Sequence, residues 1–169
     1  ADWGKAKKAW GSPRDYGELE TNMDLLYDTF VSKGVPVIID EFGAVNKNEN
    51  TADRAAYFEY YIKSAKDHGI NTMVMDLGDA IRYDSHPEIA VEGAWDHDQM
   101  RSEVLKLQGM GFEVVPKLNF SSCHDIWLKE YSRMLSTPIY YQVCKDIIAE
   151  VCEVFKPKYF HLGMDEENY

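Results

Sequence analysis

Hydrophobic and polar positions along the chain alternate between two periods, and this alternation repeats four times. In each repeat, apolar residues first recur every three to four positions, which predicts an amphipathic helix, and then form a short continuous run, which predicts a buried strand. Glycine or proline stands at each change of period. The expected helices span residues 18–34, 51–69, 95–111 and 136–157, and the expected strands follow at 35–43, 70–79, 112–122 and 158–167.

Helix-end residues and the order of elements indicate the fold. Asp96 suits an N-cap, and either Ser136 or Thr137 can cap the last helix, with Pro138 in its first turn. Strands that are apolar on both faces and alternate with helices are typical of a parallel sheet covered by helices. A full TIM barrel takes eight such units and about 250 residues. We therefore expect an α/β fold of four βα units with parallel strands, half of a TIM (βα)8 barrel, in a single domain over residues 1–169.

Charge and apolar run length narrow the possible partners. The 169 residues carry a formal net charge of −11, and no basic stripe interrupts them. Because so acidic a surface repels phosphate backbones, we expect no nucleic-acid partner. The apolar runs are too short for a membrane span, and the first ten residues lack the apolar region of a signal peptide. We expect a soluble protein without a membrane partner, in a compartment that the sequence does not indicate.

The cysteines and acidic residues give no sign of a bound metal or cofactor. Cys123, Cys144 and Cys152 are too few for a disulfide framework, and we expect buried free thiols. A nucleophilic Cys123 beside His124 is the alternative, although sequence neighbours are badly placed for a thiolate–imidazole pair. The acids that follow the second strand, together with His86, lack the dense spacing of metal ligands. We therefore expect no cofactor and no metal.

Carboxylates gather where the expected strands end, which is the active face in barrels of alternating strands and helices. Glu41 follows the first strand and Glu166 the fourth. A pair of carboxyl groups, one protonated and one ionised, is the machinery of most glycoside hydrolases. The alternative is that both are solvated acids at strand ends, because strongly perturbed carboxylates are a minority.

Other polar and aromatic residues are candidates for binding a substrate at the same face. Asp76 and Asn119 stand at the ends of the second and third strands, and His161 lies within the fourth. The flat rings of Trp10 and Trp95 suit the faces of sugar rings. For His161 the alternative is a satisfied core residue, and for each tryptophan it is core packing or the anchoring of a loop.

The residues around Glu41 resemble a known family. Residues 3–70, with VPVIIDEFGAV as their most specific segment, resemble the region around the seventh strand of the family 5 glycoside hydrolases, the endoglucanase-like cellulases. This resemblance implies that Glu41 is the catalytic nucleophile. Asp40 stands where the family usually has glycine, and its negative charge would make Glu41 a weaker nucleophile. The following strand, MVMDLGD, lacks the sugar-stacking tryptophan of the family.

A second resemblance begins near residue 70. The segments INTMVMDLGDAIRYDSHPEIAVEGAW, GFEVVPKLNFSSCHD and YFHLGMDEE look like strands two to four of a barrel related to the family 20 hexosaminidases. That family carries His-x-Gly-Gly-Asp-Glu on its fourth strand, and here the motif has Met164 in place of the second glycine. The resemblance implies that Glu166 is the general acid/base and that Asp165 orients the 2-acetamido group of the substrate, which acts as the nucleophile.

Two glycosidase families in one short chain indicate an engineered chimera with its junction near residue 70, and a natural recombinant or a fragment is the alternative. Glu41 and Glu166 lie three strands apart, but in the direction opposite to that in the cellulase-like family. Since an error of about 1 Å can cost about 10²-fold in rate, we expect at most weak hydrolysis of β-linked glycans. Carbohydrate is the expected ligand if the protein is active.

Two further interpretations involve no turnover. One is a designed chimeric (βα)4 scaffold that assembles into a barrel, and the other is a carbohydrate-binding remnant that uses Trp10, Trp95 and Trp127. A half barrel exposes two strand edges and an apolar inner face, so it needs a partner. We therefore expect a homodimer or a larger assembly of this chain.

Overall fold

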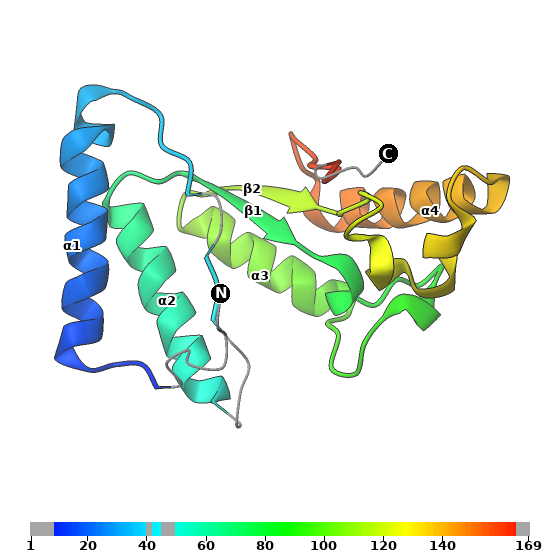
Figure 1. The fold of residues 1–169 in the computed structure, drawn as a ribbon, viewed down its shortest axis with the longest axis horizontal. Helices are drawn as coiled ribbons and strands as arrows, with labels where there is room; N and C mark the ends of the chain where they lie inside the picture. The colour runs from blue at the N-terminus through cyan, green and yellow to red at the C-terminus, as the bar shows by residue number, and fades with distance from the viewer. Residues whose placement is uncertain (1–8, 40–41, 45–49, 165–169) are drawn as a thin grey trace. The chain divides into compact units, whose positions relative to one another are not determined.

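The computed structural model describes residues 9–39, 42–44 and 50–164 of the chain. It divides into two compact units, Ala1–Asn71 and Thr72–Tyr169 (Figure 1). The division falls beside the point where the sequence changes from one resemblance to the other. The expectation of one domain over the whole chain stays a prediction, and each unit is described by itself.

Two helices dominate the first unit. They are α1 (Pro13–Thr29) and α2 (Thr51–Asp67), and a 3-10 turn, η2 (Val31–Lys33), follows α1. The first helix begins five residues earlier than its apolar spacing predicts, because Ser12 and Asp15 form a reciprocal capping box around a proline in the first turn. At the other end, η2 stops at a glycine with φ of 74°, a left-handed conformation that favours glycine.

The core of the first unit is small and strongly aromatic. Leu19 and Met23 of α1 and Ala65 of α2 are its buried apolar residues. Around them pack partly buried apolar side chains, namely Trp10, Ile39, Tyr57, Tyr60, Tyr61 and Ile70. Such aromatic residues bury much area for their number, which lets two helices hold together around three buried side chains.

The first expected strand is not formed in the part that the structure describes. Residues 35–39 belong to no strand, and Val35 and Ile38 are 46% and 89% exposed. Beyond the gap in the described residues, Phe42 stacks on Tyr61 of α2 with ring centroids 4.4 Å apart. An apolar run alone does not make a strand, because a strand also needs a neighbouring strand for its backbone hydrogen bonds.

His68 connects the two helices of the first unit. Its Nε2 lies 3.0 Å from Asp24 Oδ1 of α1 and its Nδ1 lies 2.7 Å from the carbonyl oxygen of Ser64. Both partners are acceptors, so the full set of hydrogen bonds needs a proton on each ring nitrogen. Burial alone lowers the pKa of His68, but these two hydrogen bonds and the charges of Glu20 and Asp24 outweigh it, and the pKa is raised above 6.5.

We expect the stability of the first unit to fall as the pH rises through the pKa of His68. A raised folded-state pKa gives a stabilisation that is complete below the unfolded-state value of 6.5 and is lost as the ring loses its proton. Asp24→Asn should flatten this dependence, whereas Asp28→Asn, one turn along α1, should not. The check is the free energy of unfolding from urea melts between about pH 6 and pH 8. Equal slopes for wild type and Asp24→Asn would contradict it.

The second unit contains the parallel strands. Its main elements, in chain order, are β1 (Thr72–Asp76), α3 (His97–Gly109), β2 (Glu113–Lys117), the 3-10 segment η5 (Asp125–Met134) and α4 (Pro138–Phe155). Two short 3-10 turns, η3 (Gly78–Ala80) and η4 (Pro87–Ile89), lie in the loop between β1 and α3. Figure 1 shows β1 and β2 side by side, and α3 and α4 both contact β2.

Helix ends in the second unit follow the sequence closely. Asp96 caps α3 in a capping box with Gln99, and Thr137, one of the two candidates, caps α4 by accepting a hydrogen bond from the backbone of Tyr140. The helix α4 ends at Lys156 in a left-handed conformation, directly before Pro157. Its buried residues recur at helical spacing: Tyr140, Val143, Ile147, Val151, Val154 and Phe155.

Within the described residues, the sheet contains two of the four expected strands. β1 and β2 are parallel, with Met73 opposite Val114 and Asp76 opposite Lys117. On the other side of β2, Lys117 forms a single parallel bridge with His161. Backbone hydrogen bonds from Leu118, Phe120 and Ser121 to the 161–163 segment continue this pairing. The described residues thus hold a mixed helix and strand fold with parallel strands, and the full set of four βα units stays a prediction.

Candidate functional site

The carboxyl ends of the paired segments bring three polar side chains together. Asp76 ends β1, Lys117 ends β2 beside it, and His161 lies beside Lys117 on the next segment. The Lys117 ammonium is 3.3 Å from Asp76 Oδ2, and its side chain is 19% exposed. We call these three residues the polar row. In parallel sheets, residues paired across neighbouring strands point to the same face, so the row lies on one face of the sheet.

The backbone after His161 fixes the orientation of its ring. The Gly163 N–H donates a hydrogen bond to His161 Nδ1 at 3.0 Å. A backbone N–H can only donate, so Nδ1 must be without a proton in this arrangement, and the ring carries its proton on Nε2. The row therefore contains a carboxylate acceptor, an ammonium donor and an imidazole N–H donor.

Gly163 also lies unusually close to Asn119. A Cβ at position 163 would lie 2.6 Å from the Asn119 Cα, and the glycine has φ of 58°. The buried Asn119 accepts the Ser121 N–H at its Oδ1, at 3.2 Å, and accepts the indole N–H of Trp127 at its carbonyl oxygen, at 2.7 Å. The segment after β2 is thus held on one side by the 161–163 segment and on the other by η5.

A second lysine–aspartate pair lies outside the polar row. Lys129 of η5 places its ammonium 3.1 Å from Asp79 Oδ2, in the loop after β1. Lys129 has φ of 56° and ψ of −123°, a conformation that is strained for a residue other than glycine. Trp127 packs against Gly78 in the same loop, so η5 contacts the loops that follow both strands.

The loop after β1 is anchored to α4 by a carboxylate. Both oxygens of Glu150 accept backbone hydrogen bonds, from Asp84 at 2.7 Å and from Ser85 at 2.9 Å. His97 Nε2 lies 3.3 Å from the same carboxylate, and His86 Nε2 lies 3.5 Å from Asp146 one turn earlier on α4. These contacts order the long connection between β1 and α3, which carries Trp95.

A tyrosine–glutamate pair ties the same loop to η5. The Tyr131 hydroxyl donates to Glu88 Oε1 at 2.6 Å. This hydrogen bond lowers the pKa of Glu88, although desolvation opposes the effect. The same bond, with desolvation and the nearby acids, raises the pKa of Tyr131 to about 12. At neutral pH the uncharged Tyr131 hydroxyl therefore donates to the Glu88 carboxylate. This hydrogen bond stabilises the loop, and the pair does not act as a catalytic acid and base.

The two tryptophans proposed from the sequence have different surroundings. Trp95 is 41% exposed, and its backbone pairs with Ala80 and Arg82 in the loop after β1. Trp10 lies in the first unit, where its ring makes edge contacts with Tyr16 and Tyr57. The packing gives Trp10 a place in the aromatic core of that unit, and its role in substrate binding stays a prediction.

The carboxylates to which the sequence assigns the chemistry, Glu41, Asp165 and Glu166, lie outside the described residues. Of the other candidates, Asp76 and His161 are brought together, and Asn119 adjoins His161 through Gly163. Sequence reasoning missed Lys117, which lies between the two. A lysine within an apolar strand run was the available signal, because a charge in a buried strand requires a partner.

Two negative observations apply to the part of the chain that the structure describes. Within it, His, Cys, Asp and Glu side chains form no group of three or more that could hold a metal ion. Within the same residues, every helix is too short or too polar to cross a bilayer. The expectation of a protein without metal or cofactor rests on the sequence and stays a prediction.

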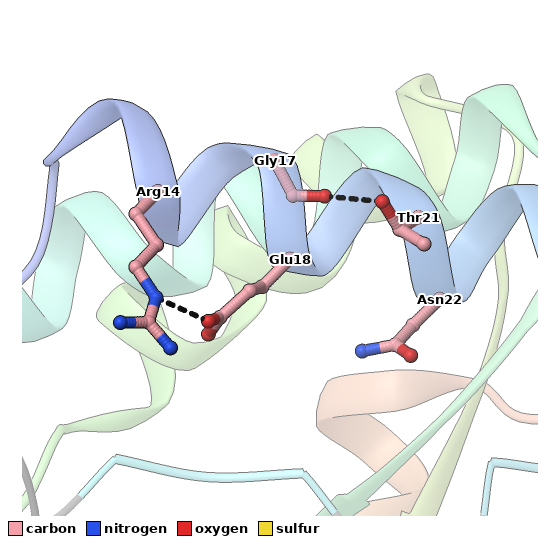
Figure 2. A pocket seen from close by; sticks show the side chains of 5 residues that line it. All are labelled: Arg14, Gly17, Glu18, Thr21 and Asn22. Carbon is pink, nitrogen blue, oxygen red and sulfur yellow. Dashed lines mark hydrogen bonds and ion pairs between the residues drawn. The ribbon is translucent and has the colours of Figure 1, made fainter.

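An open hollow of about 520 Å³ lies along α1, a helix that contributes no residue to the polar row. Figure 2 shows its lining, in which Arg14 pairs with Glu18 and the Thr21 hydroxyl donates to the carbonyl oxygen of Gly17. All of the lining residues, which also include Asn22, come from one helix. A hollow without an opposite wall cannot enclose a ligand, so we place the candidate site at the polar row.

Comparisons with known proteins give the chemical context. Endoglucanase A of Clostridium longisporum is 51% identical over 61 residues, which cover 36% of this chain and 12% of that protein. Endoglucanase B of Neocallimastix patriciarum is 44% identical over 64 residues, which cover 38% of this chain and 13% of that protein. The chain thus spans about an eighth of the length of these relatives.

A more distant similarity covers more of the chain. Lacto-N-biosidase of Bifidobacterium bifidum is 22% identical over 125 residues, which cover 65% of this chain and 11% of that protein. The match to the lacto-N-biosidase covers more residues than the segment 82–169 contains, so it overlaps the match to the cellulases along the chain. A clean junction near residue 70 therefore stays a proposal. Residues 3–81 of the chain match the family model for the cellulases of glycosyl hydrolase family 5. This match ends eleven residues after residue 70, where the resemblance based on sequence motifs ends.

Proposed function

We propose that this chain derives from glycoside hydrolases and that it hydrolyses β-linked glycans at most weakly, through Glu41 and Glu166. The match of residues 3–81 to the cellulase family carries the proposal. That segment contains the VPVIIDEFG motif, whose glutamate is Glu41. The similarity to a lacto-N-biosidase supports a carbohydrate substrate from an independent direction.

The roles follow the two resemblances. Glu41 acts as the nucleophile, Glu166 as the general acid/base, and Asp165 orients the substrate. Most glycoside hydrolases work through two carboxyl groups held in different protonation states, one to attack or activate and one to protonate the leaving oxygen. Activity is weak because Asp40 places a second negative charge beside Glu41 and because catalysis depends on the separation of the two carboxyl groups.

The geometry at the carboxyl ends of β1 and β2 supports a ligand site in the second unit. The polar row collects donors and an acceptor at the edge where parallel βα folds hold their substrates. Asp76 and His161 belong to the row, Asn119 follows Lys117 by two residues, and Trp95 lies in the connection between β1 and α3. We assign these four residues to sugar binding within the proposed function.

The expected result is slow release of the aryl group from β-glucosides, β-cellobiosides or N-acetyl-β-glucosaminides. Glu41→Gln and Glu166→Gln should each lower the rate by about 10²-fold or more, because each removes a group that changes its bond or proton in the reaction. Glu18→Gln is the matched control, since Glu18 is an exposed acid on α1. Wild-type release no faster than that of the Glu41→Gln, Glu166→Gln double variant would refute hydrolysis.

A second candidate function is a self-assembling scaffold without turnover, in which two half barrels pair. Within the described residues, β1 has β2 as its one paired neighbour, and Val74 on it is 49% exposed. Exposed apolar side chains on a strand favour association with another copy of the chain. Light scattering of the same samples over a dilution series tests this candidate, and a monomer at every concentration would count against it.

A further inference from the structure

The two faces of the β1–β2 sheet differ in what covers them. Val114, Pro116 and Leu118 alternate along β2 and its continuation, and all three are almost completely buried. Both α3 and α4 contact β2, and right-handed crossovers between neighbouring parallel strands place successive helices on the same face. On the other face, Val74 and Asp76 of β1 are exposed, whereas Val115, two residues before Lys117 on β2, is buried. The polar row therefore lies on the face opposite the helices, which is the inner face in a barrel.

The polar row is held by several independent contacts. The Lys117 carbonyl oxygen accepts the Leu77 N–H on the β1 side, and the backbone of His161 pairs with Pro116 and Leu118 on the other side. The His161 ring is held by the Gly163 N–H, and the Lys117 ammonium by Asp76. Side chains whose orientation is fixed before a ligand arrives lose little entropy on binding, which is the usual requirement for a specific site.

The charges within the row offset each other. The carboxylate of Asp76 and the ammonium of Lys117 form a pair, and the bond from Gly163 requires an uncharged His161 ring. The chain as a whole carries a formal charge of −11, so its field repels anions. A hydroxyl group can both donate and accept, so neighbouring hydroxyls can bond to the acceptor and the two donors of the row.

We propose that the polar row binds neighbouring hydroxyl groups of a neutral glycan and that Lys117, at its centre, is a specificity-determining residue. The inference rests on the proposed function and deepens it by naming a further binding residue and the substrate class. A sugar that carries a carboxylate binds less well, because the row holds no net positive charge and the acidic chain repels the ligand. Lys117 acts on binding and takes no proton from the substrate.

The test is the affinity of the full chain for cellotetraose and for tetragalacturonate, by isothermal calorimetry. Lys117→Met keeps an apolar stem of similar length and removes the charge, and Lys129→Met does the same to the other lysine–aspartate pair. We expect Lys117→Met to weaken cellotetraose binding about tenfold and Lys129→Met to change it less than about twofold. A Lys117→Met, Asp76→Asn double variant leaves no unpaired carboxylate and should lose at least as much affinity, because Asp76 also belongs to the row.

Each of the following results would refute one part of the proposal. Equal effects of Lys117→Met and Lys129→Met, or no binding of cellotetraose to the wild type, would refute the row as a sugar site. Tighter binding of tetragalacturonate would refute the neutral substrate class. The same titrations in the Glu41→Gln, Glu166→Gln variant separate the two proposals, since binding that persists without hydrolysis refutes only the proposed activity. A shift of the His161 ring nitrogen signals on addition of cellotetraose, which in Lys117→Met needs about tenfold more ligand, locates the ligand at the row.

Discussion

Replacing Gly163 with alanine should be among the most disruptive single changes in the second unit. The new Cβ would lie 2.6 Å from the Asn119 Cα and 2.9 Å from its Oδ1, distances that real structures do not show. One contact is to backbone, so the two segments must move apart. The residue would also have to hold φ of 58°. Strain and overpacking together should cost about 2–6 kcal/mol.

Hydrogen exchange gives a local measurement of this loss. The amides of Leu118 and Ser121 donate to His161 and Gly163, so their protection should fall when the segments separate. Gly93→Ala is the matched control, because Gly93 also has positive φ, 81°, but a Cβ there meets nothing within 4 Å. Only the cost of a left-handed conformation, about 1–2 kcal/mol, applies to that control. Equal protection in the two variants would show that the close approach to Asn119 does not exist.

Truncating Ile147 should cause the second large loss. This residue is fully buried in the middle of α4, on the stripe that faces β2 and α3. Ile147→Ala removes three carbon atoms from a closely packed interior, and the cavity adds to the lost transfer free energy. We expect the free energy of unfolding to fall by about 2–5 kcal/mol, measured from urea melts as a lower midpoint at unchanged slope.

Ile139 gives the control on the same helix. It is 57% exposed, so Ile139→Ala should change the free energy of unfolding by no more than about 0.5 kcal/mol. Both substitutions improve helix propensity by the same small amount, which therefore cancels in the comparison. If the two variants lost equal stability, the burial of Ile147 would be wrong and α4 would not face the sheet.

Local chemistry made the helices of this chain predictable. Asp96 and Thr137 cap the helices that their positions predict, because an N-cap depends on a side chain and a backbone amide three residues away. The apolar stripe of α1 begins only at Leu19, so the apolar spacing places the start of this helix too late. The capping residues Ser12 and Asp15 indicate the true start. The 3-10 segment η5 was not among the expected elements, although Leu128, Tyr131 and Met134 recur at near-helical spacing.

Strands and the site were less predictable, because they depend on partners that are distant in sequence. The runs around Val74 and Val115 pair with each other, whereas the apolar run that contains Ile38 has no pairing in the described residues. Asp76 and His161 could be selected as polar residues at strand ends. The sequence marks Lys117 only as a lysine within an apolar strand run, and its role depends on the register that places it between these two residues.

The contacts of Trp127 limit how η5 can move. Its indole donates a buried hydrogen bond to Asn119 and packs on Gly78, so η5 cannot swing away without breaking that bond. Leu128 of the same segment is fully buried, so moving η5 away would also expose apolar surface, and an open state should be populated in well below about 1% of molecules. Segment 125–134 should thus stay in place against the loops that follow β1 and β2. A ligand that prefers the open state would have to offset the cost of opening before it gains any affinity.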